Sequence, residues 1–326
     1  MQISVAMCTY NGERYLHEQL QSIAAQSLPP SELVVCDDGS TDSTIAVLEE
    51  FRRRASFDVR IIRNEKNLGI TQNFEKAIKL CNGEFIALSD QDDVWLPDKL
   101  KCLSELLAKD SSLGGIFSDA ELIGKDSQVN GKRLWATLGW PLKEGDFERA
   151  NGIKLLLHGV VATGSMLMFR AAARSFMCPI PRSWAHDAWI TWILVLYSKL
   201  ACVSDPLTGY RIHPNQYTGI ASLTFYQQFQ RRRRETSDKF EAWSNQFEEL
   251  RNRWIAQPGD DFEKCLTIIE NRITFFRNRA ALPRNPWSRA RKVLGSASSY
   301  RYYAGGLNSM LRDIFIPAIR NSRERT

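Results

Sequence analysis

The sequence places three carboxylates within four consecutive positions, directly after an apolar run. The run is Phe-Ile-Ala-Leu-Ser at 85–89, and Asp90, Gln91, Asp92 and Asp93 follow it. Carboxylates this close together repel one another at neutral pH unless a cation neutralises them. Divalent cations such as Mg²⁺ or Mn²⁺ prefer oxygen ligands, and substrate phosphates complete their coordination. A helix cap would need only one Asp, so the pattern predicts a divalent-cation site.

Two more carboxylates, Asp37 and Asp38, follow a second apolar run and precede Gly39 and Ser40. Paired acids at the end of a strand suit polar ligand groups such as a base N–H or ribose hydroxyls. The alternative is structural, with a turn at Asp38-Gly39 and with Asp42 as the cap of the next helix. For this segment alone, the structural alternative is the stronger one.

Another acidic residue stands beside aromatic side chains at the start of an apolar helix. Asp187 lies between Trp184 and Trp189 and directly follows His186. It could simply cap the helix, but a partly desolvated carboxylate is also suited to act as a general base. The local sequence favours neither interpretation over the other.

Arg211 and His213 belong to the last of these segments, Tyr-Arg-Ile-His at 210–213. They could bind a metal–diphosphate complex, His213 through a ring nitrogen and Arg211 through charge-assisted hydrogen bonds. A lone His is more often structural, and the chain has only four. This segment therefore gains meaning only in combination with the others.

The elements that must position these residues alternate between strands and helices. Strands are predicted at Ile3–Thr9, Leu33–Asp37, Val59–Arg63, Glu84–Ser89 and Gly115–Asp119, and helices at Glu13–Gln26, Ser43–Arg54, Ile70–Cys81 and Pro97–Lys109. This alternation predicts right-handed crossovers and an α/β fold with a mostly parallel sheet flanked by helices. Because ligands bind at the carboxyl ends of such strands, we expect the acidic segments to meet there.

The rest of the chain divides into an irregular stretch, a second regular stretch and a helical tail. Residues 120–150 are polar and are predicted to be irregular, whereas 151–220 return to helices and strands. From Phe225 onward only helical patterns occur. We therefore expect a catalytic domain at 1–222 and a helical, basic C-terminal region at 223–326.

Taken together, these segments resemble the family-two inverting glycosyltransferases of the GT-A (Rossmann-like) fold, over roughly residues 1–220. A single motif of this kind is weak evidence for the family, but five of them in the right order are strong evidence. The resemblance implies a nucleotide-contact loop after the first strand, a base-binding acidic pair, and a loop near the ribose and diphosphate. The residues that match these three parts are Thr9, Tyr10, Asn11 and Glu13, then Asp37 and Asp38, then Asn67 and Gly69.

The acidic run at 90–93 matches the DxD motif of that family. The resemblance implies that Asp92 and His213 bind the cofactor, Mg²⁺ or Mn²⁺. It also implies that Asp90, Gln91 and Arg211 contact the donor, with Asp90 at the ribose or the metal shell.

Asp187 matches the family's catalytic base, although His186 stands where the family has Glu. The implied reaction is a single displacement with inversion, in which Asp187 takes the proton of the acceptor hydroxyl as it attacks the anomeric carbon. A bound cation neutralises the charge of the departing nucleoside diphosphate. Asp37 would accept a hydrogen bond from a pyrimidine N–H, while Thr9 and Tyr10 would border the base.

The residues around the DxD motif and 210–213 look like those of bacterial rhamnosyltransferases. Those enzymes use dTDP-rhamnose in the assembly of surface polysaccharide or lipopolysaccharide. Hexose and N-acetylhexosamine transferases share most of these residues. The expected partners are therefore a dTDP- or UDP-sugar donor and a saccharide or lipid-linked acceptor.

The net charge of +6 is unevenly distributed. Residues 226–326 carry 20 Lys and Arg against 11 Asp and Glu, whereas residues 1–225 carry 23 against 26. Within 283–326, nine basic residues are interleaved with five aromatic ones, a composition that suits an anionic membrane surface. The same composition would also suit binding to nucleic acid or packing of this segment on the catalytic domain. A membrane-tethered acceptor would explain such a tail.

Composition excludes several other classes of protein. Seven scattered cysteines form no CxxC pair, which argues against a disulfide framework or a zinc site and favours a reducing compartment. No stretch approaches the roughly 20 apolar residues of a membrane span. The first residues read as a buried strand rather than a signal peptide. We expect a cytoplasmic protein, at most peripheral on the inner face of the cytoplasmic membrane.

Two other functions remain open from the sequence. A nucleotidyltransferase also uses paired acids and Mg²⁺, but it would carry a Gly-rich basic phosphate loop, and residues 8–13 are acidic with one Gly. A nucleic-acid-binding protein would use the Arg231–Arg234 run, which explains none of the acidic motifs. Nucleic acid is therefore not an expected partner.

Overall fold

The computed structural model describes residues 1–140, 142, 149–159, 162–213, 237–304 and 306–315. Residue contacts divide the chain into two compact units, one of residues 1–155 with 160–219 and one of residues 156–159 with 220–326. The expected boundary between 222 and 223 lies outside the described residues, as does Arg231–Arg234.

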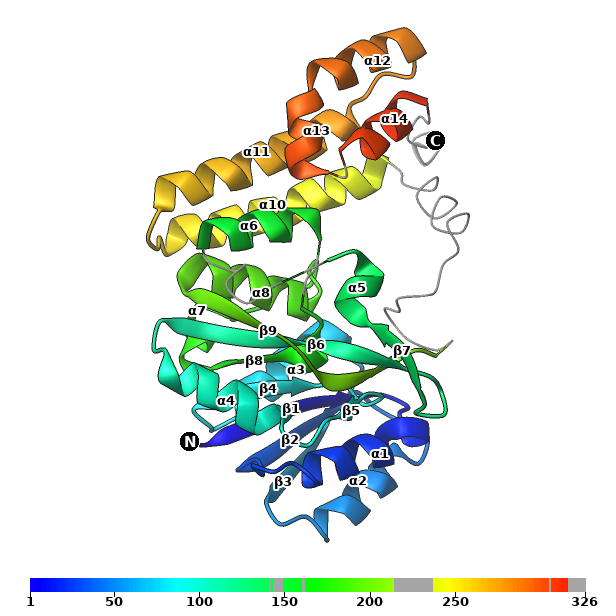
Figure 1. The fold of residues 1–326 in the computed structure, drawn as a ribbon, viewed down its shortest axis with the longest axis vertical. Helices are drawn as coiled ribbons and strands as arrows, with labels where there is room; N and C mark the ends of the chain where they lie inside the picture. The colour runs from blue at the N-terminus through cyan, green and yellow to red at the C-terminus, as the bar shows by residue number, and fades with distance from the viewer. Residues whose placement is uncertain (141, 143–148, 160–161, 214–236, 305, 316–326) are drawn as a thin grey trace. The chain divides into compact units, whose positions relative to one another are not determined.

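The first unit begins with a regular alternation of parallel strands and helices (Figure 1). Its strands lie in the order β3-β2-β1-β4, all parallel to their neighbours. Thr9 at the end of β1 pairs with Asp37 at the end of β2, so the loops after these strands leave the sheet side by side. The elements are β1 (Ile3–Thr9), α1 (Glu13–Ala24), β2 (Glu32–Asp37), α2 (Thr44–Arg52), β3 (Asp58–Arg63), α3 (Ile70–Leu80) and β4 (Phe85–Ser89).

The strand β1 is buried on both faces, which explains why all of its residues except Ser4 and Thr9 are apolar. Val5 and Met7 belong to the main core cluster, together with Leu16 and Leu20 of α1. Successive side chains of a strand point to opposite faces, so Ala6 between them, which is also buried, faces the other way. On that second face α3 packs against β1 and β2.

The second half of the sheet mixes strand directions. The order continues from β4 through β8, β6 and β9 to β5, with β7 paired to β6. The strand β8 is antiparallel to both β4 and β6, whereas β6 and β9 are parallel. The elements are β5 (Val94–Trp95), α4 (Lys99–Lys109), β6 (Leu113–Ile123), β7 (Val129–Arg133), α5 (Leu134–Leu138), α6 (Arg149–His158), β8 (Leu167–Arg170), α7 (Arg174–Met177), α8 (His186–Tyr197) and β9 (Lys199–Arg211).

The stretch expected to be irregular, 120–150, is more regular than predicted. The strand β6 continues to Ile123 because Ala120 and Leu122 are buried in the sheet. A turn then leads to β7, which pairs back onto β6 with all of its residues exposed. An exposed strand lacks the apolar alternation that identifies strands in a sequence, so the pattern missed it.

The described part of the second unit is helical after residue 236. The helices are α10 (Ser237–Ala256), α11 (Phe262–Ala280), α12 (Pro286–Gly295), α13 (Ala297–Tyr303) and α14 (Leu307–Phe315). Arg279 of α11 forms two hydrogen bonds with buried Asp313 of α14, at 2.7 and 3.1 Å, and the Tyr300 hydroxyl of α13 donates to the same carboxylate at 2.7 Å. None of the helices in the described part of the chain combines the length and apolar character that a bilayer-spanning segment needs.

Candidate active site

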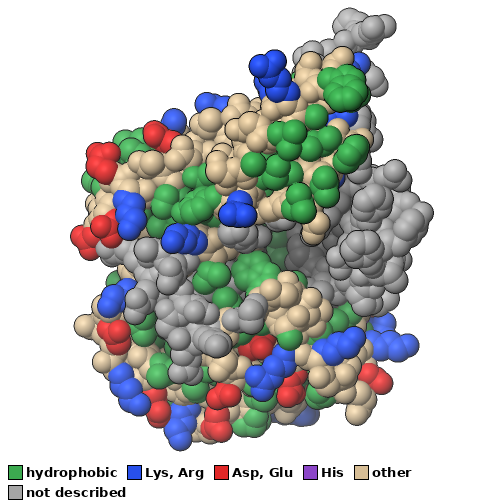
Figure 2. Space-filling view, turned by 45° about the horizontal axis from the view of Figure 1, so that its top comes forward, with side chains coloured by type: hydrophobic (Ala, Val, Ile, Leu, Met, Phe, Trp, Pro, Cys, Tyr) green, Lys and Arg blue, Asp and Glu red, His purple; other side chains and the backbone are tan. Residues whose placement is uncertain are grey.

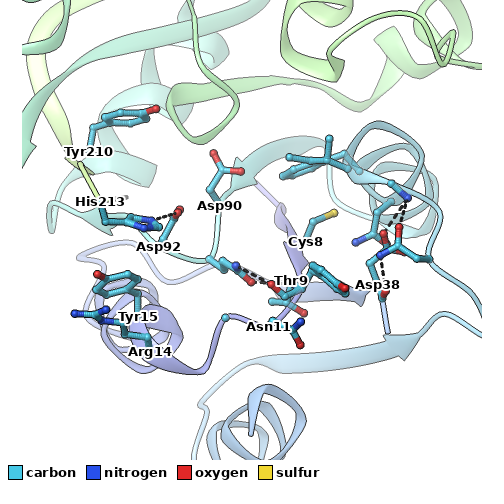
Figure 3. A pocket seen from close by; sticks show the side chains of 18 residues that line it. Cys8, Thr9, Asn11, Arg14, Tyr15, Asp38, Asp90, Asp92, Tyr210 and His213 are labelled. Carbon is cyan, nitrogen blue, oxygen red and sulfur yellow. Dashed lines mark hydrogen bonds and ion pairs between the residues drawn. The ribbon is translucent and has the colours of Figure 1, made fainter. Parts of the chain in front are cut away.

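The carboxyl ends of β1, β2 and β4 border a cavity of about 840 Å³ in the first unit (Figure 3). Figure 3 shows Tyr210, His213, Tyr15 and Arg14 on one side of it, beside Asp92, and Asp38 on the other. Four of the predicted site residues do not line it: Glu13, Asp37, Asp187 and Arg211. The predicted site residues that do line it are Thr9, Tyr10, Asn11, Asp38, Asn67, Gly69, Asp90, Gln91, Asp92 and His213.

Asp37 is fully buried behind the cavity wall. Its Oδ2 accepts hydrogen bonds from the Thr9 and Ser40 hydroxyls at 2.9 and 2.5 Å, and its Oδ1 accepts from the Ser40 N–H at 2.9 Å. Both oxygens thus face protein donors, and Asp37 does not line the cavity, so its expected contact with a nucleotide base stays a prediction. Asp37 holds the turn that carries Asp38.

Glu13 also has structural contacts. Its Oε2 accepts a hydrogen bond from the Ser43 N–H at 2.8 Å, and its own N–H donates to Asp42 at 3.1 Å. Ser43 is the first residue before α2, so Glu13 ties the start of α1 to the start of α2. Its expected contact with the donor stays a prediction.

Asp38 is the member of the acidic pair that reaches the cavity. Its carboxylate accepts hydrogen bonds from the N–H groups of Leu68 and Gly69 at 2.7 and 2.9 Å, and from the Asn64 amide at 2.8 Å. Asn67 donates to the Asp38 carbonyl at 3.1 Å. Gly69 has a φ of +82°, a conformation that favours glycine. Asp38 therefore holds the loop before α3 against the end of β2.

Gln91 links the acidic motif to the loop after β1. Its side-chain oxygen accepts from the Tyr10 N–H at 2.9 Å, and its side-chain nitrogen donates to the Tyr10 carbonyl at 3.1 Å. A Cβ at Gly12 would lie only 2.2 Å from the Gln91 oxygen, so a larger residue there would displace the Gln91 side chain from these hydrogen bonds. Gln91 thus contacts the protein backbone as well as lining the cavity.

The acidic motif carries more negative charge than its surroundings neutralise. Burial raises the pKa of Asp90, and the charges of Asp93, Asp92 and Asp187 raise it further. Burial and the charge of Asp92 raise the pKa of Asp93 to about 7. A bound cation would stabilise the ionised forms of these groups. The motif therefore fits a divalent cation.

A buried lysine, Lys99, lies behind this motif. The side chain is fully buried, and its Nζ donates to the Ser165 carbonyl and the Thr208 hydroxyl, both at 2.5 Å. Burial lowers the pKa of Lys99, while the charges of Asp93 and Asp90 act in the opposite direction. Sequence analysis missed Lys99 because nothing distinguishes a buried lysine from the solvated lysines of an ordinary helix start.

Asp92 and His213 meet at the cavity wall, although they come from segments 121 residues apart. The His213 Nε2 lies 2.9 Å from the Asp92 Oδ2, and the His213 ring contacts that of Tyr15 at 4.9 Å between centroids. Within the described residues, no group of three or more His, Cys, Asp or Glu side chains is arranged to hold a metal. A pair is still compatible with Mg²⁺, which is commonly held by one or two side chains together with phosphates and water.

Arg211 does not face the cavity, contrary to the expected contact with a diphosphate. The guanidinium is fully buried. It donates to the Glu18 carboxylate at 2.6 Å, to the Ser127 hydroxyl at 2.8 Å and to the Asp92 carbonyl at 2.6 Å. A buried guanidinium needs such partners, and they hold the end of β9 beside the acidic motif. Arg211 therefore positions Asp92 and His213 rather than lining the cavity.

Asp187 lies in the first turn of α8, partly exposed. Its Oδ1 accepts from the Ala188 N–H at 2.7 Å. Although it does not line the cavity, its charge raises the pKa of Asp90, which does. The adjacent His186 is buried and stacks on Phe74 at 3.9 Å between ring centroids. His186 is thus part of the cavity's supporting wall.

The buried His186 is expected to make the protein sensitive to mild acid. Burial lowers the pKa of His186 in the folded protein, so the unfolded state binds more protons as the pH falls below about 6.5. The free energy of unfolding should therefore fall as the pH drops through this value. Replacing His186 with Phe should reduce the loss between pH 7 and pH 5 by about 1 kcal/mol. Urea unfolding at both pH values measures this, with exposed His17→Phe as the control. If the free energy of unfolding falls equally between pH 7 and pH 5 in the wild type and in His186→Phe, the prediction is wrong.

Sequence reasoning missed further residues that line the cavity, among them Arg14, Tyr15 and Tyr210. Arg14 and Tyr15 are in the first turn of α1, directly after the loop that was expected to contact the nucleotide. Their place beside that loop was a usable signal. Tyr210 precedes Arg211 on β9, and the alternation of a strand turns these two neighbours to opposite sides. That alternation could have assigned Tyr210 rather than Arg211 to the cavity.

Comparison with known proteins assigns the family. Residues 4–176 match the model described as glycosyl transferase family 2. Since the match covers more than half of the chain, the chain belongs to this family. This membership supports the glycosyltransferase interpretation over the nucleotidyltransferase and nucleic-acid-binding alternatives.

Individual similarities are more distant. TarS residues 1–349 of S. aureus, solved with UDP-GlcNAc, match 96% of this chain and 82% of that chain with a TM-score of 0.58 and 19% identity. The mannosyltransferase PcManGT from Pyrobaculum calidifontis was solved with GDP-Man and Mn²⁺. It matches 95% of this chain and 77% of its own chain, with a TM-score of 0.53 and 16% identity. These likenesses confirm the GT-A fold. The dTDP-rhamnosyl transferase RfbG of Shigella flexneri is 39% identical over 99 residues, which cover 29% of this chain and 34% of that protein.

Proposed function

We propose that this protein transfers a sugar from a nucleoside-diphosphate sugar to a saccharide or lipid-linked acceptor in the synthesis of bacterial surface polysaccharide or lipopolysaccharide. The observation that carries the proposal is the cavity of about 840 Å³, which has Asp38 at one side and Asp92 with His213 at the other. Asn67 also lines it and donates a hydrogen bond to the Asp38 carbonyl. It offers acceptors for the polar edges of a nucleoside and, opposite them, a candidate cation site for a diphosphate.

The donor's nucleoside would bind between the loops that Asp38 organises. Thr9, Tyr10 and Asn11 border this part of the cavity, together with Asn67. Asn11 has a φ of 48°, and its side-chain oxygen accepts from the Thr41 N–H at 2.9 Å. These contacts fix the loop before a ligand arrives, which lowers the entropy cost of binding.

Mg²⁺ or Mn²⁺ would be held by Asp92 and His213, with Asp90 beside them. The raised pKa of Asp90 and its crowding with other carboxylates support this assignment, and a neighbour of the same fold was solved with Mn²⁺. When bound, the cation supplies Lewis-acid stabilisation of the charge on the departing diphosphate. Asp90, Asp92 and His213 would orient the diphosphate oxygens, and Gln91 would keep the acidic motif next to the nucleotide loop.

Asp187 is the proposed general base. It would accept the proton of the acceptor hydroxyl as that hydroxyl attacks the anomeric carbon, while the bond to the nucleoside diphosphate breaks on the opposite face. One protein base is sufficient because the diphosphate leaves without being protonated. A single displacement of this kind inverts the anomeric configuration.

The proposed donor sugar is rhamnose from dTDP-rhamnose, with UDP-hexoses as the alternatives. Support comes from the residues around the DxD motif and from the similarity to a dTDP-rhamnosyl transferase over 29% of the chain. The decisive experiment incubates the protein with radiolabelled dTDP-, UDP- and GDP-sugars and a bacterial glycolipid extract, with Mg²⁺, Mn²⁺ or EDTA. Transfer from one donor that EDTA abolishes would support the proposal. Absence of binding and transfer with every nucleotide sugar would overturn it.

The helices α12 and α14 suit an anionic membrane surface, where a lipid-linked acceptor would lie. Trp287, Leu307 and Phe315 are 86%, 67% and 74% exposed, and Figure 2 shows hydrophobic side chains gathered on this unit with Lys and Arg around them. The sole carboxylate in residues 283–315 is Asp313, which is buried and paired with Arg279. Exposed rings and cations without exposed carboxylates are the composition of an interfacial segment.

Removing the two most exposed rings should weaken binding to anionic vesicles. For Trp287→Ser with Phe315→Ser we expect a loss of about tenfold or more, because each ring contributes roughly 1.5–3 kcal/mol when its apolar surface leaves water. Flotation with phosphatidylglycerol and phosphatidylcholine vesicles measures the binding, and deletion of 283–326 should abolish the salt-sensitive part. The matched control is Val129→Ser with Ile255→Ser, which removes exposed apolar side chains elsewhere. Equal binding of both double variants would contradict the prediction.

A further inference from the structure

A permanent positive charge on a side chain would favour binding of a phosphate group in the cavity, and Arg211 does not provide it. Among the described residues that line the cavity, Arg14 is the one Lys or Arg. It is exposed, in the first turn of α1, on the same side as Tyr15, His213 and Asp92 (Figure 3). The site's one permanent cation therefore lies at the proposed metal side, away from Asp38.

Arg14 lacks the carboxylate partner that helix geometry would normally supply. Residues four apart on a helix face each other, so Glu18 is the expected partner of Arg14. The Glu18 carboxylate instead accepts from the Arg211 guanidinium at 2.6 Å and from the Ser127 hydroxyl at 2.7 Å. In the described part of the chain no carboxylate pairs with Arg14, which leaves its guanidinium available to an anion.

Tyr15 supplies a second, independent observation at the same place. It lines the cavity, is 9% exposed, and its hydroxyl has no hydrogen-bond partner in the parts of the chain that the structure describes. Buried hydroxyls normally have a partner. The Tyr15 ring lies 5.1 Å from the Arg14 guanidinium and 4.9 Å from the His213 ring centroid. The Tyr15 ring thus contacts both the guanidinium and the imidazole at this side of the cavity.

We propose that Arg14, with Tyr15 and His213 beside it, binds the oxygen atoms of a phosphate ester at the metal side of the cavity. The guanidinium would contribute charge-assisted hydrogen bonds, which are geometrically suited to phosphate. This inference rests on the proposed glycosyl transfer and names the residue that recognises its anionic group. The phosphate belongs either to the diphosphate of the donor or to a diphosphate that links the acceptor to its lipid.

Binding assays on the full-length protein separate these two sources. The variant Arg14→Met keeps most of the side-chain volume and loses the charge, and Arg14→Lys keeps the charge but loses the paired donors. In the first arm, UDP, dTDP and the nucleosides uridine and thymidine are titrated in EDTA and in Mg²⁺. In the second arm, farnesyl diphosphate is titrated onto protein saturated with nucleoside diphosphate. The control Arg53→Met removes an exposed arginine at the end of α2, outside the cavity.

A donor phosphate contact predicts that Arg14→Met weakens binding of UDP or dTDP by roughly tenfold and reduces its salt dependence, while nucleoside binding stays unchanged. The affinity of Arg14→Lys for UDP or dTDP should lie between those of the wild type and Arg14→Met. If Arg14 instead contacts a phosphate of the acceptor, Arg14→Met should weaken the binding of farnesyl diphosphate by the same factor and leave the binding of UDP and dTDP unchanged. Unchanged binding of all diphosphates would overturn the role of Arg14, as would equal weakening of nucleosides and diphosphates. If the wild-type protein binds no nucleoside diphosphate and no nucleotide sugar, the proposed function itself fails.

Discussion

Replacing Asp92 with Asn is expected to remove the metal-dependent part of donor binding. In the wild-type protein the Asp92 carboxylate lies 2.9 Å from His213 and adds to the repulsion that raises the pKa of Asp90. Asn keeps the size of the side chain and its hydrogen bond to His213, but it provides no anionic oxygen for a cation. We therefore expect Mg²⁺ and Mn²⁺ to lose their effect on the affinity for UDP and dTDP.

Thermal unfolding gives an independent measure of the same change. A ligand at 100 times its Kd stabilises the folded state by about 2.7 kcal/mol, so nucleotide plus Mn²⁺ should raise the Tm of wild type by several degrees. Asp92→Asn should lose the increment due to the metal, while its Tm in EDTA stays equal or rises because one like charge has been removed. Asp58→Asn, at the exposed start of β3, serves as the control. An undiminished metal effect in Asp92→Asn would show that the cation is held elsewhere.

Replacing Asp187 with Asn is expected to lower turnover by about 10²- to 10⁴-fold while donor binding is retained, since a general base contributes rate enhancements of this order. Asn preserves the acceptor for the Ala188 N–H at the start of α8, so the helix should form as before. The change removes an interaction that matters in the transition state alone, and kcat should fall together with kcat/KM.

Hydrolysis of the donor separates loss of the base from loss of the site. Water can attack the anomeric carbon slowly without an acceptor, so Asp187→Asn should still bind and slowly hydrolyse the nucleotide sugar. The control is Asp205→Asn, an exposed acid on β9. Near-normal sugar transfer by Asp187→Asn would assign the base to another residue, with Asp90 the next candidate because it lines the cavity.

The sequence by itself determined the order of the elements in the first 120 residues, apart from the two-residue strand β5. Strands such as β1 are mostly apolar because both faces of the sheet are covered, and the helices between them repeat their apolar residues every three to four positions. Local pattern is sufficient where burial is complete. It failed for β7, which is exposed, and it indicated only the helical nature of the C-terminal region. The acidic motif at 90–93 was also identified correctly as a crowded group of carboxylates.

The tertiary structure alone decided which of the candidate residues reach the cavity. Asp37 and Asp38 are adjacent in sequence, yet Asp37 accepts hydrogen bonds from Thr9 and Ser40 away from the cavity, whereas Asp38 lines it. Arg211 pairs with Glu18, 193 residues away, and this pairing leaves Arg14 without its helical partner. Such outcomes depend on hydrogen bonds between distant segments, because a buried charge must find partners wherever the fold brings them. Composition and spacing can identify a polar residue, but the partners that occupy it are set by the folded chain.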